Sequence, residues 1–332
     1  MVEVGKPFNF AEIRTAHDRI RPFVHRTPVL TSSRLDEASP ATAGLFFKCE
    51  NFQKVGAFKA RGATNAVLAL DDATAQRGVA THSSGNHGAA VALAAKLRGI
   101  PAYIVMPSNS AKVKVRAVEG YGAHVVFCER TEEARETKCA EVIKRTSATL
   151  IHSFENEHVI AGQGTAAVEL LEDVPDLDVI MCPVGGGGLL SGTAIAAKSM
   201  RPQIKVIAVE PANADDAAQS FRAGRRLVTE KTFTIADGLR TNIGEPNFAI
   251  VQRYVDDIVT VSERAIISAM RTIWETMKII IEPSAAVPYA AIQESKINMA
   301  GRRIGVILTG GNVDLDALPW IDLSRGSRAE GG

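Results

Sequence analysis

A run of four glycines, Gly185 to Gly188, is the stretch of this sequence with the clearest chemical meaning. The apolar run 179–184 before it predicts a buried strand, and the segment 189–200 after it predicts a helix. Glycine lets backbone N–H groups approach a ligand closely, and a helix N-terminus favours a negative charge. The stretch therefore predicts a phosphate-binding loop, with a plain strand-to-helix turn as the alternative. It has neither the GxGxxG spacing of a dinucleotide site nor the lysine of a P-loop.

Three other stretches carry groups that suit an amino-acid substrate and its cofactor. Lys59 follows Phe58 in KVGAFKARGATNA, and we expect a desolvated amine with a lowered pKa, as a Schiff-base lysine requires; an exposed helix lysine is the alternative. The loop 83–88, SSGNHG, gathers hydroxyl, amide and backbone donors, which suit a carboxylate; an ordinary helix cap is the alternative. Thr309, in TGGN, ends a predicted strand, where its hydroxyl could face a ring nitrogen. Together with the phosphate loop, these groups suggest pyridoxal 5′-phosphate and an amino-acid substrate.

Short apolar runs alternate with helical patterns along the chain, and this alternation predicts an α/β fold with parallel sheets. Ligands bind at the C-terminal ends of the strands in such sheets, where three of the four stretches are expected to lie. The segment 154–165 is predicted to be a loop, and 212–247 to have little regular structure. The predicted strands are 45–49, 79–81, 102–106, 123–127, 150–151, 179–184, 205–209, 257–261 and 303–308. The predicted helices are 8–25, a segment from 57, 89–97, 112–119, 131–146, 165–171, 189–200, 262–277 and 283–295.

Composition excludes several classes of function. The 332-residue chain carries 38 basic and 37 acidic side chains, a balance that gives no indication of nucleic acid or an anionic membrane as partner. Its four cysteines are scattered without CxxC spacing, which disfavours a zinc site and a disulfide scaffold and suits a reducing compartment. The first twenty residues lack the apolar core of a signal peptide, and no window reaches about eighteen apolar residues. We expect a cytoplasmic protein without a membrane segment.

The four motifs FKARGA, SSGNHG, GGGG and TGGN, in this order and over nearly the whole chain, resemble the fold-type II pyridoxal-phosphate enzymes. Above all they resemble the serine racemase and serine/threonine dehydratase family. The resemblance implies two domains, each with a mostly parallel sheet flanked by helices. Residues 1–75 and 155–332 would form the large cofactor-binding domain, and 76–154 a small mobile domain with the SSGNHG loop. It also implies a homodimer.

The resemblance also implies roles for the cofactor-binding residues. Lys59 would form the Schiff base with the cofactor and act as the base at the substrate α-carbon. Phe58 would pack against the pyridine ring, and Asn86 would hydrogen-bond the phenolic oxygen. Gly185, Gly186, Gly187 and Gly188 would bind the phosphate. Thr309 would face the pyridine nitrogen, which a hydroxyl leaves largely unprotonated, and this favours β-elimination.

Substrate recognition is implied by the same resemblance. Ser84 would be the second acid/base, on the face opposite Lys59; biosynthetic threonine dehydratases usually carry alanine there. The substrate carboxylate would be bound by the residues of the loop, Ser83, Ser84, Gly85, Asn86 and His87.

Two basic residues match positions that face the active-site mouth in serine racemases, namely Lys114 and Arg135. A bidentate pair between Arg135 and a β-carboxylate would favour a dicarboxylic substrate; surface charges are the alternative. Asn242 departs from the serine of mammalian-type racemases beside the substrate.

A divalent-cation site is implied in the stretch EPANADD. Oxygen ligands suit Mg²⁺, or Ca²⁺ or Mn²⁺ in its place, and not zinc. The stretch is similar to the cation site of serine racemases, with the carboxylates of Glu210 and Asp216 and the carbonyl of Ala214 as ligands. A solvated acidic loop is the alternative.

The sequence thus predicts a β-elimination enzyme for a 3-hydroxy amino acid. Our main hypothesis is conversion of 3-hydroxyaspartate to oxaloacetate, via iminosuccinate, with release of ammonia. The stretch TIADGLRTNIGEPNFAIV is similar to that of bacterial hydroxyaspartate dehydratases. The nearer alternative is a serine racemase or a serine/threonine dehydratase that yields pyruvate or 2-oxobutyrate. A non-catalytic protein that binds the cofactor or an amino acid is disfavoured, because Lys59 and Ser84 are both present.

Overall fold

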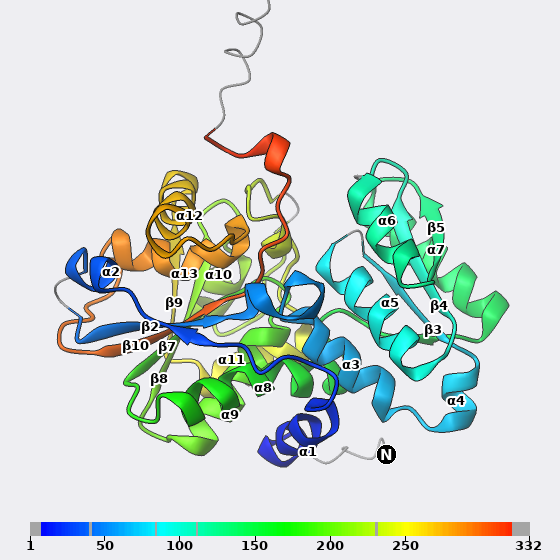
Figure 1. The fold of residues 1–332 in the computed structure, drawn as a ribbon, viewed down its shortest axis with the longest axis horizontal. Coiled ribbons are helices and arrows are strands. Elements are labelled where there is room, and N and C mark those ends of the chain that lie inside the picture. The colour runs from blue at the N-terminus through cyan, green and yellow to red at the C-terminus, as the bar shows by residue number, and fades with distance from the viewer. Residues whose placement is uncertain (1–7, 40–41, 84, 111, 230–231, 321–332) are drawn as a thin grey trace, which may run out of the picture.

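Two sheets organise the chain in the computed structural model, which describes residues 8–39, 42–83, 85–110, 112–229 and 232–320. A six-stranded sheet has the order β1-β2-β10-β7-β8-β9, and a four-stranded sheet the order β5-β4-β3-β6 (Figure 1). The strands are β1 (Val29–Leu30), β2 (Gly44–Cys49), β3 (Val79–His82), β4 (Ala102–Pro107), β5 (His124–Cys128), β6 (Thr149–Leu150), β7 (Val179–Pro183), β8 (Lys205–Pro211), β9 (Asp257–Val261) and β10 (Arg303–Leu308).

The helices of the described chain are α1 (Phe10–Ile20), α2 (Ser33–Glu37), α3 (Lys59–Ala69), α4 (Asp72–Gln76), α5 (Asn86–Arg98), α6 (Lys112–Gly120), α7 (Glu132–Thr146), α8 (Glu157–Asp173), α9 (Gly188–Met200), α10 (Asp216–Ala223), α11 (Glu245–Tyr254), α12 (Glu263–Met277) and α13 (Pro283–Gln293). Four short 3₁₀ helices are η1 (Glu50–Phe52), η2 (Lys54–Gly56), η3 (Asp237–Leu239) and η4 (Leu315–Ala317). None of these helices is long and apolar enough to cross a membrane.

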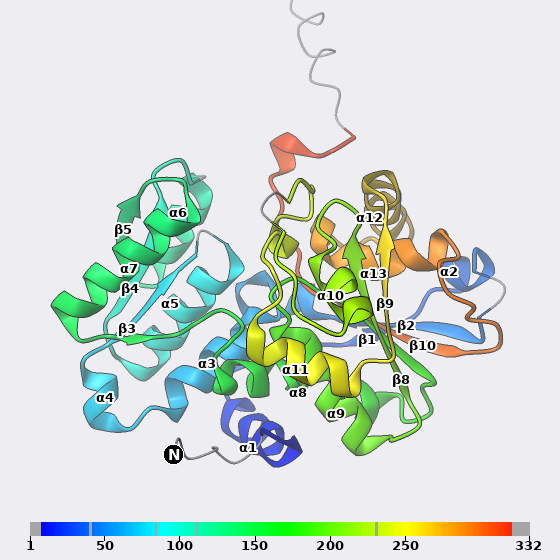
Figure 2. The same ribbon diagram turned by 180° about the vertical axis from the view of Figure 1, so that it is seen from behind.

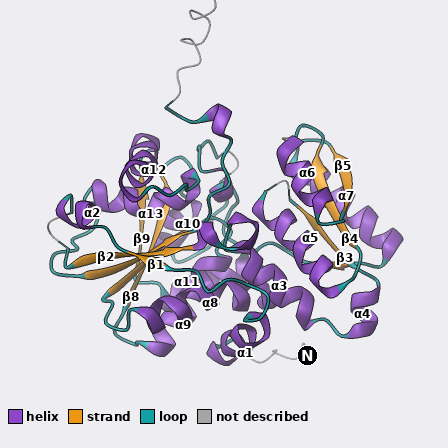
Figure 3. Ribbon diagram, in the orientation of Figure 1, coloured by secondary structure: helices purple, strands orange, loops and turns teal. Residues whose placement is uncertain are grey.

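The six-stranded sheet is parallel except for β1, and helices cover both of its faces (Figure 3). Strand β7 is buried along its whole length, as expected of a parallel strand between two helical layers. Its side chains alternate between the layers: Met181 joins the core with α12 and α13, whereas Ile180 and Cys182 join the core with α8 and α9. This layering confirms the predicted α/β fold.

The four-stranded sheet is parallel throughout and stands beside the larger sheet, with α3 between them (Figures 1 and 2). Helix α3 packs against α5 on one side and α8 on the other. Helix α5 ends at Arg98, and Gly99 caps it in the left-handed conformation with a φ of 71°. All strands of this sheet lie within 79–150, inside the predicted small domain; the boundaries at 76 and 154, and its mobility, stay predictions.

Two predicted irregular regions contain helices. Helix α8 begins at Glu157 inside the predicted loop 154–165, and the side chain of Asn156 caps it. Two of its glycines obscure the helical pattern but are needed for packing: a Cβ on Gly162 would lie 2.6 Å from Gly62 Cα, and a Cβ on Gly164 would lie 2.8 Å from Gly192 O. The region 212–247 likewise contains α10 and the start of α11.

Candidate active site

The segment just before Lys59 is hydrogen-bonded to the residues that follow β10. Phe58 N donates to Thr309 O at 3.0 Å, Ala57 and Gly310 form an isolated bridge, and Gly311 N donates to Gly56 O at 2.9 Å. Three contacts thus bring together two motifs that lie about 250 residues apart in the sequence. The SSGNHG, GGGG and TGGN stretches follow β3, β7 and β10, so their predicted place at strand ends is confirmed.

Lys59 opens helix α3, and its amine lies among groups that withdraw it from water. Nζ donates to Ser153 O at 2.9 Å and lies 5.1 Å from the centre of the Phe58 ring. Burial lowers the Lys59 pKa to about 8, against a smaller opposing effect of the Glu282 charge. The amine therefore has the lowered pKa that the sequence predicts.

The four glycines form a loop in which no side chain fits. A Cβ on Gly186 would collide with the Phe154 ring, and a Cβ on Gly187 would lie 2.8 Å from Asn247 Cβ. Gly187 also has a φ of 91°, which L side chains rarely adopt. Helix α9 begins at Gly188, so backbone N–H groups and a helix N-terminus are available for an anion, as a phosphate requires.

Thr309 carries a hydroxyl that suits the ring nitrogen of a cofactor. The residue is 3% exposed, and its Oγ1 is buried without a hydrogen-bond partner among the described residues. A buried hydroxyl without a partner is costly and is usually satisfied by another group. Together with the glycine loop and the amine of Lys59, this hydroxyl makes the site fit pyridoxal 5′-phosphate.

Asn86 opens helix α5 and is joined to the large sheet by two side chains that the sequence analysis did not assign. Its Nδ2 donates to both Glu282 oxygens, at 3.0 and 3.1 Å, and its Oδ1 accepts from Asn312 Nδ2 at 2.8 Å. Burial, with a further contribution from Asp237, raises the Glu282 pKa to about 7. In the sequence, the only signal for Glu282 is its place directly before the proline that opens helix α13.

The SSGNHG loop is placed in part. Ser84 lies outside the described residues. Ser83 Oγ accepts from Gly85 N at 3.2 Å, directly before helix α5. The buried His87 ring bonds to Ile151 O through Nε2 at 2.9 Å, and burial lowers its pKa to about 3, so the ring is neutral at physiological pH.

The two basic residues predicted to read the far end of the substrate differ in their surroundings. Lys114 Nζ lies 3.4 Å from Asp237 Oδ2, in an ion pair between α6 and η3. Arg135 has no carboxylate partner in the described chain, and its Nε is buried without a hydrogen bond. Its charge adds to the effect of burial in lowering the pKa of His82, at the end of β3. Arg135 is thus a cation near the loop with an unused binding capacity.

The side chain of Asn242 is hydrogen-bonded to the backbone of Thr229. Its Oδ1 accepts from Thr229 N at 2.8 Å, and its Nδ2 donates to Thr229 O at 3.2 Å. The preceding residue, Thr241, points its hydroxyl at the glycine loop, 3.4 Å from where a Cβ on Gly185 would stand. The structure therefore brings Thr241, which the sequence analysis missed, to the site, and the substrate contact of Asn242 stays a prediction.

The predicted metal ligands lie at the end of β8. Glu210 and Asp216 are 0% and 1% exposed, and Asp216 Oδ1 has no hydrogen-bond partner among the described residues. Burial and the neighbouring Asp216 charge raise the Glu210 pKa well above its ordinary value, and burial raises that of Asp216 to about 6. Two buried carboxylates with an unused oxygen fit a divalent cation. The described chain has no cluster of three histidine, cysteine or acidic residues for a metal, so the predicted site would depend on a backbone carbonyl as a further ligand.

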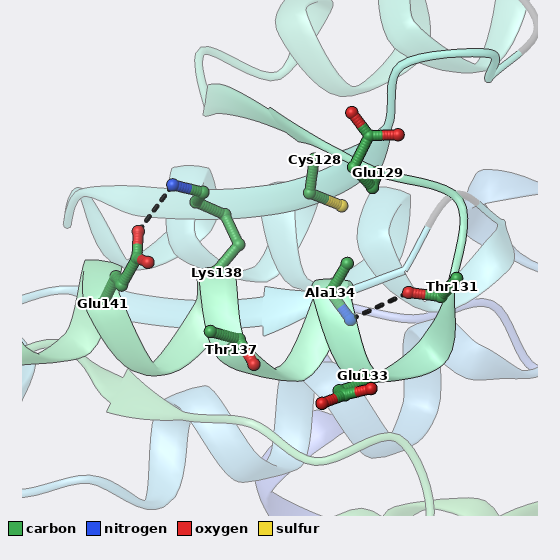
Figure 4. Close-up of a pocket in the computed structure, with 8 residues that line it drawn as sticks. All are labelled: Cys128, Glu129, Thr131, Glu133, Ala134, Thr137, Lys138 and Glu141. Carbon is green, nitrogen blue, oxygen red and sulfur yellow. Dashed lines mark hydrogen bonds and ion pairs between the residues drawn. The ribbon is translucent and has the colours of Figure 1, made fainter.

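A hollow of about 520 Å³ lies elsewhere, between the end of β5 and helix α7 (Figure 4). Its rim holds an ion pair between Lys138 and Glu141, and the hydroxyl of Thr131 caps α7. No residue predicted for the site lines it.

Comparison with known proteins agrees with this geometry. The chain matches the family model "Pyridoxal-phosphate dependent enzyme" over residues 20–310. It is 50% identical to a serine racemase of Oryza sativa subsp. indica, over 97% of this chain and 95% of the relative. It is 47% identical to a beta-hydroxyaspartate dehydratase of Paracoccus denitrificans, over 94% and 98%. The structure of maize serine racemase superposes with a TM-score of 0.91 at 47% identity, covering 97% of this chain and 98% of that one.

Similarity to the racemases and to the dehydratase extends over nearly the whole chain and at nearly equal identity. The chain therefore belongs to the family of pyridoxal-phosphate-dependent enzymes of fold type II that includes the serine racemases and dehydratases.

Proposed function

We propose that this protein removes water from 3-hydroxyaspartate and releases oxaloacetate and ammonia, with pyridoxal 5′-phosphate as cofactor. The observation that carries this proposal is Arg135, a cation near the substrate loop without a carboxylate partner in the described chain. The second carboxylate of the substrate would supply that partner through a bidentate pair. Similarity to a β-hydroxyaspartate dehydratase supports the same substrate.

The cofactor would be held by residues that the fold has gathered. The N–H groups of the loop Gly185–Gly188 would bind its phosphate, Phe58 would pack on its ring, Thr309 Oγ1 would face the ring nitrogen, and Asn86 would donate to its phenolic oxygen. When bound, pyridoxal 5′-phosphate draws electrons from the substrate α-carbon and makes the α-proton acidic.

Proton transfer falls to Lys59. A pKa of about 8 gives this amine a neutral fraction near pH 7 to 8 that an ordinary lysine lacks, so Nζ can accept the α-proton. Ser84 is proposed as the second acid/base on the opposite face. Loss of the α-proton and the β-hydroxyl removes one water, and hydrolysis of the resulting imine returns it, which yields the 2-oxo acid and ammonia.

Substrate binding would use both sides of the site mouth. The loop residues Ser83, Ser84, Gly85, Asn86 and His87 would hold the α-carboxylate, chiefly through backbone N–H groups at the start of α5. Thr241 would line the wall beside the glycine loop. Lys114, which is paired with Asp237, would contribute less to the distal carboxylate than Arg135.

A divalent cation, Mg²⁺ or Ca²⁺ or Mn²⁺, is proposed between Glu210, Asp216 and the carbonyl of Ala214. The cation would neutralise two buried carboxylates and thereby stabilise the end of β8. Added Mg²⁺ should raise the melting temperature of the chelated protein, and Asp216→Asn should abolish that response. An unchanged melting temperature in the wild type would exclude the site.

The homodimer implied by the family resemblance stays a prediction.

A serine racemase or a serine/threonine dehydratase is the second candidate, and the 50% identity to a serine racemase favours it. It would use the same cofactor and the same Lys59, without the distal carboxylate. The two candidates therefore differ in substrate and share the machinery.

Product analysis separates the two candidates. The purified protein, loaded with pyridoxal 5′-phosphate and Mg²⁺, is supplied with the four stereoisomers of 3-hydroxyaspartate, with L- and D-serine and with L-threonine. The 2-oxo acids and the serine enantiomers are then identified by chromatography. We expect oxaloacetate from one hydroxyaspartate isomer at a kcat/KM at least about tenfold above that for serine. Dominant pyruvate, 2-oxobutyrate or interconverted serine would replace this proposal by the second candidate.

A further inference from the structure

We infer that Asn312 is a positioning residue, which fixes the orientation of the Asn86 amide and so the binding of the cofactor. Asn312 ends the TGGN motif, in which only the threonine received a role from the sequence. The inference rests on the proposed contact between Asn86 and the phenolic oxygen of pyridoxal 5′-phosphate.

The orientation of both amides follows from a backbone carbonyl. Asn312 Nδ2 lies 2.7 Å from Val55 O, and a carbonyl can only accept, so the atom facing it must be the nitrogen. The same Nδ2 lies 2.8 Å from the Asn86 side chain, which must therefore present its oxygen. Asn86 is left with its Nδ2 on the other side, where it donates to Glu282. The chain of bonds from Val55 thus permits one orientation of Asn86.

This orientation suits the proposed cofactor contact. An amide nitrogen carries two hydrogens that point well apart, whereas the two oxygens of the Glu282 carboxylate, at 3.0 and 3.1 Å from Nδ2, lie close together and share one of them. The second hydrogen of Asn86 Nδ2 remains for an oxygen acceptor such as the phenolic oxygen of the cofactor. In the reversed orientation Asn86 would present its oxygen to the carboxylate of Glu282 and to the cofactor, and both contacts would be repulsive.

The backbone before Lys59 is shaped around Asn312. Val55 has φ 58° and ψ 12°, a left-handed conformation that a β-branched residue adopts only under constraint. Gly56 has φ 70°, and a Cβ there would lie 2.6 Å from Asn312 Oδ1. The segment therefore holds an unfavourable conformation at Val55 and a glycine at 56, and together they place Val55 O against Asn312 and leave room for its side chain.

The test measures the dissociation constant of pyridoxal 5′-phosphate for the apoprotein, by equilibrium dialysis, in a double-mutant cycle. Asn312→Asp keeps the shape of the side chain but removes both donated bonds, and Asn312→Ala removes them without adding charge. Each variant is made in the wild type and in Asn86→Ala. Asn298→Asp is the matched control, because Asn298 is exposed and its Oδ1, which accepts from Ala300 N, is retained by aspartate. Far-UV circular dichroism establishes that each apoprotein is folded.

We expect Asn312→Asp to raise the dissociation constant about tenfold in the wild type and to have almost no effect in Asn86→Ala. Asn312→Ala should act in the same direction by a smaller factor, and Asn298→Asp should have no effect. Equal losses in both backgrounds, or no loss in the wild type, would overturn the inference while leaving the proposed function intact. An unchanged dissociation constant for Asn86→Ala would instead remove the proposed Asn86 contact, and with it the inference.

Discussion

Lys59 and Arg61 lie two residues apart on α3, and the protein surrounds these two basic groups in opposite ways. Arg61 is completely buried and donates to two carboxylates, at 2.7 Å to Glu50 Oε2 and at 2.7 Å to Glu169 Oε2. Lys48 completes this cluster, 2.7 Å from Glu169 Oε2, so that two cations balance two anions. Among the described residues, Lys59 has a single hydrogen bond, to a neutral carbonyl.

The presence or absence of paired carboxylates gives Arg61 and Lys59 opposite pKa shifts. Burial acts to lower the pKa of Arg61, but the two carboxylates raise it above the ordinary value, so Arg61 stays charged at any pH the fold survives. Burial of Lys59 without a bonded carboxylate brings its pKa to about 8. A buried charge with two paired carboxylates fixes helix α3, whereas a partly buried amine without a paired carboxylate, on the same helix, has a pKa of about 8.

The largest expected effect comes from breaking the compensated cluster. Arg61→Met leaves Glu50 and Glu169 buried with only Lys48 as a cation, and we expect it to lower the free energy of unfolding by about 3–5 kcal/mol. The matched control is Arg271→Met, which removes an exposed pair with Glu275 and should cost about 0.5 kcal/mol or less. Urea unfolding of both variants measures the difference. Similar small losses would show that the cluster is not needed to hold α3.

A smaller effect is expected at Lys59 and depends on pH. The folded-state pKa of about 8 lies below the ordinary 10.5, so the unfolded chain binds more protons between these values, and the stability of the wild-type apoprotein rises with pH there. Lys59→Met removes this dependence and should be the more stable protein at pH 7, by about 1–2 kcal/mol. That advantage should disappear toward pH 10, as seen by urea unfolding, whereas Lys138→Met should show no such trend. If Lys59→Met were still more stable than the wild type at pH 10, the Lys59 amine would not be desolvated.

The smallest effect concerns Glu282, a buried carboxylate without an ion pair in the described chain. Its folded-state pKa of about 7 exceeds the ordinary 4.5, so the folded chain binds more protons in this window, and Glu282 lowers stability as pH rises from 4.5 to 7. Glu282→Gln should therefore gain stability relative to the wild type over that window, by about 1 kcal/mol. The exposed Glu275→Gln serves as control.

The same titration should be visible in activity. The carboxylate form of Glu282 accepts from Asn86, so kcat/KM of the wild type should rise with pH through about 7, and Glu282→Gln should lack that limb while keeping the limb that Lys59 gives near pH 8. A rising limb that survives the substitution would assign it to another group.

Features of the fold and of the site that arise from local sequence patterns were predictable, whereas those that arise from tertiary contacts were not. The strands β9 and β10 and the motifs around Lys59 and the four glycines were predictable, because periodic patterns and glycine runs are local signals. The start of α8 was not, because Gly162 and Gly164 serve contacts with other helices. Glu282 and Asn312 gain their roles only from tertiary contacts with Asn86.

The charge cluster and the irregular segment beside the glycines were also beyond sequence reasoning. In the sequence, the members of this cluster look like ordinary surface charges, and only the fold brings them together: Lys48, Glu50, Arg61 and Glu169. Thr241 and Asn242 are adjacent, and only the backbone conformation decides which of them faces the glycine loop.

The most direct test of the account concerns Arg135, the cation near the substrate loop that forms no ion pair with a described carboxylate. The measurement is the ratio of kcat/KM for 3-hydroxyaspartate to kcat/KM for serine, in the wild type, in Arg135→Ala and in Arg145→Ala as an exposed control on the same helix α7. We predict that Arg135→Ala lowers this ratio about tenfold or more, with activity on serine nearly retained, while Arg145→Ala leaves it unchanged. Equal losses on both substrates would contradict recognition of the distal carboxylate by Arg135.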